Sequence, residues 1–130
     1  MSFGAGCVII ICMSDIEYVD QPIELESLKR VAKRKFGDMV KAVVDVRQEV
    51  MAMGGELHAD EESFLLDKGS NQDELWGINI YPDITMPDAL EFDSMINIRP
   101  SQNNSSRDVE AEAIRGKITK IVAALIPDLS

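Results

Sequence analysis

The sequence predicts a single α+β domain, in which a mainly antiparallel sheet of four strands carries helices on one face. Three observations predict this fold class. The 130 residues suffice for one domain with its own core, and 45% of them are apolar. Apolar residues recur at helical spacing near both ends, whereas β-branched and alternating segments fill the middle. Most predicted strands are joined by short links, which favours antiparallel pairing. The predicted order is α-β-β-(short α)-β-β-α.

The first half of the chain predicts one helix and two strands. Apolar residues recur at helical spacing over 24–36, and Gly37 is a suitable stop. The β-branched segment 39–46 predicts the first strand. A turn then leads into a second strand that starts at Val50 and reaches Gly54 or beyond.

The second half begins with a short helix over Asp60–Leu66, for which Asp60 is a suitable N-cap. Two strands follow at 77–82 and 95–100, and they share the pattern Ile-Asn-Ile-x-Pro. An acidic connection separates these strands, and the polar loop 101–108 follows them. The last helix is expected over 108–125, where Pro127 lies just beyond its end.

Residues 1–21 are expected to be an N-terminal extension, so that the domain spans 22–127. The apolar run Cys7–Met13 is too short to cross a bilayer, which takes about 20 helical residues. No Lys or Arg precedes the run, so it is a poor signal peptide. Met13 offers an alternative start, which makes residues 1–12 a loose tail or an artefact of the assigned start. The competing interpretation is a short buried strand.

Charge and cysteine content narrow the class of protein. The chain has 23 acidic and 13 basic residues, and its net charge of −10 repels phosphate backbones, so no nucleic-acid partner is expected. Cys7 and Cys12 are too few for a tetrahedral zinc site and indicate a reduced, cytoplasmic protein. Neither a membrane partner nor a nucleotide-binding glycine motif is indicated.

Strand alternation predicts a candidate site on the polar face of the sheet. If the last three strands are neighbours, their apolar residues face the core and six polar side chains share the other face: Glu56, His58, Asn79, Tyr81, Asn97 and Arg99. This set could bind a small anionic or polar molecule. The alternative is an ordinary solvent-exposed face, since one face of an antiparallel sheet is commonly wet.

Each predicted site residue has a chemical role. Arg99 can hold a carboxylate or phosphate through two parallel hydrogen bonds. His58 is the only histidine, so with Glu56 it is the candidate for proton transfer. Asn79 and Asn97 would orient the ligand, with Tyr81 beside them.

The loop after the last predicted strand offers further donors. Ser101, Asn103 and Arg107 lie between Arg99 and the final helix, and helix N-termini attract anions. The alternative is that Ser105, Ser106 or Asp108 merely caps this helix.

A metal site is a weaker alternative. Glu56, His58 and Asp60 occupy alternate positions, and Asp93 could join them. One histidine with carboxylates suits Mg²⁺ or Mn²⁺ better than structural zinc. Asp60 cannot cap the predicted helix and bind a metal at the same time. No cofactor is therefore assigned.

Four strings carry a resemblance to a known family: GDMVKAVVD (37–45), GELHADEE (55–62), LWGINIYP (75–82) and FDSMINIRPSQ (92–102). They resemble a small bacterial family, also found in cyanobacteria, that is classed as a domain of unknown function. The resemblance covers roughly residues 22–125 and implies no activity, cofactor or mapped site.

Two expectations come from the resemblance. Members of the family begin close to the first helix, which implies that residues 1–12 are extra. They read Arg-Pro-Ser-Gln-Gly-Asn-Arg-Ser-Arg at the loop, where this chain has Asn103 for the glycine and Ser105 for an arginine. The loss of that arginine weakens anion binding by the loop, while asparagine still tolerates a left-handed turn.

Three classes of function therefore stay open. The first is a protein that binds a small anionic or polar molecule, with hydrolytic activity as a possible extension. The second is a non-enzymatic interaction or regulatory module, whose partner is another protein or a second copy of the chain. The third is an RNase-like toxin that uses His58, Arg99 and Arg107, against which the acidity of the chain argues.

Overall fold

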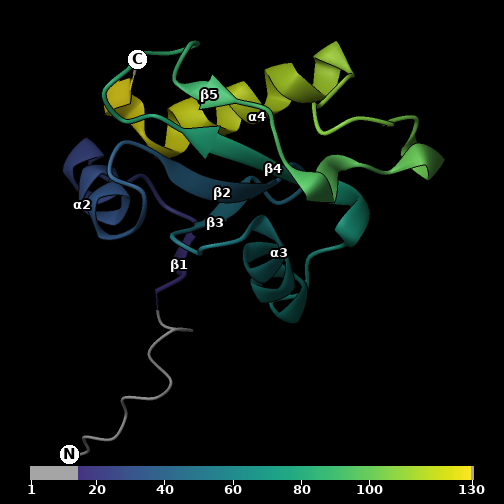
Figure 1. The fold of residues 1–130 in the computed structure, drawn as a ribbon, viewed down its shortest axis with the longest axis horizontal. Coiled ribbons are helices and arrows are strands. Elements are labelled where there is room, and N and C mark those ends of the chain that lie inside the picture. Colours follow the sequence, from purple (N-terminus) through teal and green to yellow (C-terminus); the bar gives the residue numbers. More distant parts are fainter. Residues whose placement is uncertain (1–14, 130) are drawn as a thin grey trace, which may run out of the picture.

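A computed structural model describes residues 15–129 (Figure 1), and it confirms a single small α+β domain with an antiparallel sheet. The strand order is β1-β3-β2-β4-β5, and every neighbouring pair is antiparallel. The elements run along the chain as β1 (Glu17–Val19), α2 (Leu25–Lys35), β2 (Val40–Asp45), β3 (Val50–Met53), α3 (His58–Asp67), β4 (Leu75–Ile80), β5 (Leu90–Glu91) and α4 (Glu112–Leu125).

The sheet has five strands where the sequence predicts four. Strand β1 pairs with β3 in the register Glu17↔Met53 and Val19↔Met51, so the sheet begins ahead of residue 22. Three residues are too short to show alternation, which is why the sequence does not reveal this strand. Residues 1–14, including the apolar run and both cysteines, lie outside the described part of the chain.

The predicted strand at 95–100 is wrong. Met95–Asn97 and Pro100–Gln102 are single 3-10 turns, and the neighbour of β4 is instead the two-residue strand β5. The alternation of Ile96 and Ile98 was the signal for a strand. In the structure these two residues do not share a face, since Ile96 packs on the core while Ile98 is exposed.

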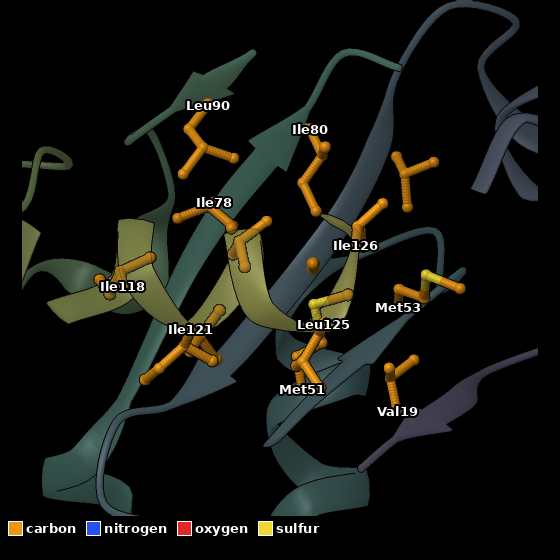
Figure 2. Packing of buried hydrophobic residues seen from close by; sticks show 14 of the residues in the cluster. Val19, Met51, Met53, Ile78, Ile80, Leu90, Ile118, Ile121, Leu125 and Ile126 are labelled. Atoms are coloured by element: carbon orange, nitrogen blue, oxygen red, sulfur yellow. The ribbon is translucent and has the colours of Figure 1, made fainter. Parts of the chain in front are cut away.

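Helices cover both faces of the sheet, whereas one face was predicted. In Figure 1, α4 lies above the sheet and α3 below it. Helices α2 and α4 pack on the larger core, where Ile118, Ile121 and Leu125 of α4 meet Met51 and Ile78 of the sheet (Figure 2).

Helix α3 covers a second, smaller cluster on the opposite face. Its Leu65 is fully buried against Val43, Ala52 and Leu75. Because Val43 and Val44 are consecutive and both buried, β2 is apolar on its two faces, and each face needs a cover.

Strand β3 ends at Met53 because the backbone turns at Gly54, which has a φ of +95°. A Cβ atom at Gly54 would lie 2.6 Å from the carbonyl oxygen of Asp15, so only glycine fits this close approach. The turn takes Glu56 and His58 out of the sheet, and α3 starts at His58 rather than at Asp60. None of the helices within residues 15–129 is long and apolar enough to span a membrane.

We predict that Leu65→Ala lowers the free energy of unfolding by about 2–5 kcal/mol, because it opens a cavity between α3 and the sheet. Its neighbour Leu66 is 40% exposed, so Leu66→Ala is the matched control and should cost far less. Urea unfolding of both variants measures the difference. Equal losses would mean that α3 does not form a buried layer.

Candidate functional site

A cavity of about 190 Å³ lies where the start of α3 meets the segment between β5 and α4. Its floor and walls come from three parts of the chain: β2, the first turn of α3, and the turn over Met95–Asn97 with the loop beyond it. The residues around it are Lys41, Leu57, His58, Ala59, Ser94, Met95, Ile96 and Arg107. Of the residues predicted from sequence, His58 and Arg107 come together here.

Gly77 of β4 sets how closely His58 and Ser94 approach the sheet. A Cβ atom on Gly77 would lie 2.6 Å from both Cβ and Oγ of Ser94, and 3.2 Å from Cδ2 of His58. The absence of a side chain at this position therefore lets both residues pack directly on the backbone of the central sheet.

His58 is held neutral and in one tautomer. Its Nε2 lies 2.8 Å from the carbonyl oxygen of Ile78, which can only accept, so Nε2 carries the hydrogen. Burial lowers the pKa of His58 below its ordinary value, against the opposing effect of this hydrogen bond.

Two basic side chains line the cavity although the chain is acidic. Lys41 is half-buried, and its Nζ lies 5.4 Å from the centre of the Phe36 ring. Within residues 15–129 it forms no ion pair. Arg107 is paired with Asp93 at 2.6 Å through Nε. The N-cap of α3 is Leu57, so no side chain caps the first N–H groups of the helix. Two cations and a helix start thus converge on the cavity.

Arg99 lies elsewhere, against Trp76. Its guanidinium carbon sits 4.1 Å from the centre of the indole ring, and its Nη atoms donate to the carbonyl oxygens of Gln72 and Leu75. These contacts attach the 3-10 turn over Gln72–Glu74 to the loop after β5. The predicted grouping of Arg99 with His58 on one strand face does not occur, because β3 ends at Met53, ahead of His58, and residues 95–100 do not form a strand.

Asn97 is fully buried and binds the backbone of β4. Its Oδ1 accepts from the N–H of Gly77 at 2.8 Å, and its Nδ2 donates to the carbonyl oxygens of Gly77 at 3.0 Å and Arg107 at 2.9 Å. The Asn97 amide therefore supplies the hydrogen bonds that a neighbouring strand would give to Gly77. This explains why residues 95–97 need not be extended.

Asn79 and Tyr81 form a third group, around β5. Asn79 Nδ2 and the Tyr81 hydroxyl both donate to Oε1 of Glu91, at 2.9 and 3.1 Å. The Oδ1 of Asn79 is buried without a partner in the described chain.

The donors of the predicted anion-binding loop already bind a carboxylate of the protein itself. Oε2 of Glu110 accepts from the N–H groups of Ser105 and Ser106, both at 3.0 Å, and from the Ser106 hydroxyl at 2.6 Å. These bonds lower the pKa of Glu110. Ser101 and Asn103 are exposed, and Asn103 adopts the left-handed conformation expected of it, with a φ of 60°.

Glu56 is separated from His58. Its carboxylate lies 3.7 Å from Lys35 in another cavity, of about 360 Å³, which Asp15, Asp60 and Phe64 also line. Within residues 15–129, no three His, Cys, Asp or Glu side chains come together as a metal site, so Glu56, His58, Asp60 and Asp93 do not form the divalent-metal cluster considered above.

The family model described as "Protein of unknown function (DUF5674)" matches residues 17–125. The chain belongs to this family. The match begins at β1 and ends at the last residue of α4, so it includes every helix and strand described above. No curated protein and no solved structure matches the chain.

Lys41 and Ser94 are not among the side chains that the sequence pattern groups into a site. A signal for Lys41 was present, since it is the only charged residue in the apolar run 39–44, and alternation places it on the face opposite Ala42 and Val44. No pattern marks Ser94, whose position depends on the close approach to Gly77.

We predict that Asn97→Ala destabilises the protein by several kcal/mol, because it leaves buried N–H and C=O groups of Gly77 unpaired at about 1–3 kcal/mol each. Asn71 is exposed and its side chain makes no capping bond, so Asn71→Ala is the matched control and should be nearly neutral. Denaturant unfolding measures both. A small effect at Asn97 would show that β4 does not depend on this amide.

The bonds to Glu110 predict a pH-dependent contribution to stability. Because its pKa is lowered by folding, the carboxylate stabilises the native state above the unfolded value of about 4.5, and this contribution disappears as the pH falls through the folded value. Glu110→Gln should therefore lower the thermal midpoint more at pH 7 than at pH 3. Glu74→Gln, at a side chain without a hydrogen bond in the described chain, is the control, and an equal deficit for Glu110→Gln at both pH values would contradict the assignment.

Proposed function

We propose that the protein binds a small oxyanion, a phosphate or carboxylate group, in the cavity between α3 and the loop after β5. The observation that carries the proposal is the convergence of Lys41, Arg107 and the uncapped start of α3 on one cavity, in a chain whose net charge is −10. An acidic protein has no general reason to gather positive charge in a hollow.

Each group has a role that its geometry supports. Lys41 supplies a charge without a carboxylate partner in the described chain, which an oxyanion would neutralise. Arg107 uses Nε on Asp93, and its two Nη groups remain for a ligand. The first N–H groups of α3 and the Ser94 hydroxyl supply neutral donors.

The geometry favours binding over hydrolysis. A general base needs a free lone pair of its own, aimed at the proton that it removes. The Nε2 of His58 donates to Ile78, which leaves only Nδ1 for that role, and Nδ1 forms no hydrogen bond to a hydroxyl or a carboxylate within residues 15–129. Glu56 lies in a different cavity. We therefore place His58 in the wall of the site as a positioning residue.

Titration of the isotope-labelled full chain with inorganic phosphate, followed by NMR, tests the proposal. Saturable shifts are expected at the amides of Leu57–Ala59 and Ser94–Ile96. Lys41→Gln and Arg107→Gln should each weaken phosphate binding by about tenfold, as expected for loss of a charged hydrogen bond.

Lys120→Gln and Arg30→Gln are the matched controls, because they remove the same charges from exposed positions on α4 and α2. They should leave binding unchanged. Absence of shifts at the cavity, or equal weakening by the controls, would overturn the proposal.

A further inference from the structure

The rim of the same cavity is unusually apolar. Leu57 is 59% exposed and Met95 is 65% exposed, which makes them the two most exposed large apolar side chains within residues 15–129. Both line the cavity that holds Lys41 and Arg107. Ile96 adds a partly buried wall below them.

Folding does not account for these two side chains. Leu57 occupies the N-cap of α3, where Ser, Thr, Asp or Asn would stabilise the helix by about 1 kcal/mol. Met95 is the first residue of a 3-10 turn whose other members, Ile96 and Asn97, face inward. Exposed apolar side chains that gather at a hollow, rather than scatter singly, are typical of binding sites.

The cavity combines charged and apolar side chains, which suits an amphipathic ligand. The basic side chains of Lys41 and Arg107 line the same cavity as the two exposed apolar side chains. At about 190 Å³ the cavity is smaller than the roughly 300–1,000 Å³ of sites for drug-sized ligands, so it fits a head group and part of a short apolar chain.

We propose that the ligand is an amphipathic oxyanion, whose head group lies between Lys41 and Arg107 and whose short apolar group rests between Leu57 and Met95. This inference rests on the proposed oxyanion site and adds the class of molecule that it selects. The apolar group is small, since only two exposed apolar side chains and a cavity of about 190 Å³ are available to it.

A series of inorganic phosphate, methyl, butyl and hexyl phosphate tests the inference on the full chain by calorimetry. Affinity should rise along the series by about two- to fourfold for each methylene that the rim buries. In Leu57→Ala and Met95→Ala the rise should flatten when each affinity is compared with the same variant's affinity for inorganic phosphate. Ile84→Ala, which truncates another exposed apolar side chain away from the cavity, should keep the full rise.

The two proposals fail in different ways. If inorganic phosphate binds but the alkyl chain adds nothing, the oxyanion site stands and the amphipathic ligand is overturned. If no member of the series binds, both are overturned. Self-association of the protein that Leu57→Ala abolishes, without any dependence on chain length, would assign the rim to a second copy of the chain and overturn the inference as well.

Discussion

The amide of Asn97 holds together the part of the molecule where the cavity forms. Strand β5 covers β4 only at Asn79 and Ile80, so the backbone of Gly77 needs another partner. Asn97 supplies an acceptor and a donor to that one residue, and its second N–H reaches the carbonyl of Arg107. Because buried polar groups must be paired, this single side chain determines where the turn over Met95–Asn97 and the following loop lie.

The cavity is a consequence of this arrangement. A regular strand beside β4 would lie in the plane of the sheet and leave no room next to α3. The 3-10 turn instead places Ser94 and Met95 beside the first turn of α3, and the loop returns Arg107 to the same place. The cavity that Lys41 and Arg107 line thus arises where the hydrogen-bond ladder of the sheet is interrupted.

The sequence predicts a helix or strand well when the segment is long enough to show a repeating pattern of apolar residues. The helices near 24–36 and 108–125 have several turns of apolar periodicity, and both exist close to those limits. The sequence also predicts β2 from its β-branched residues, β3 from the turn that precedes it, and β4 from the alternation of its residues. Strands β1 and β5, with three and two residues, carry too little pattern to be recognised.

The candidate site was harder to predict, for a specific reason. Alternation places side chains correctly only while the chain stays extended, and it stops at Gly54 and after Ile80. His58 was therefore expected beside Arg99 but lies with Lys41 and Arg107. Likewise the loop donors were recognised, whereas their partner Glu110 was not, because a carboxylate four or five residues away leaves no mark in the pattern.

Gly77 has a consequence for how such a cavity can diversify. At the base of the cavity, His58 and Ser94 pack directly on the backbone of Gly77, so substitutions at these positions are hardly tolerated. Leu57 and Met95 stand outside the packed interior, and replacing them disturbs neither hydrophobic cluster. For the ligand proposed here, selectivity can therefore change through Leu57 and Met95 while the packing at Gly77 stays constant, so recognition and folding depend on different residues.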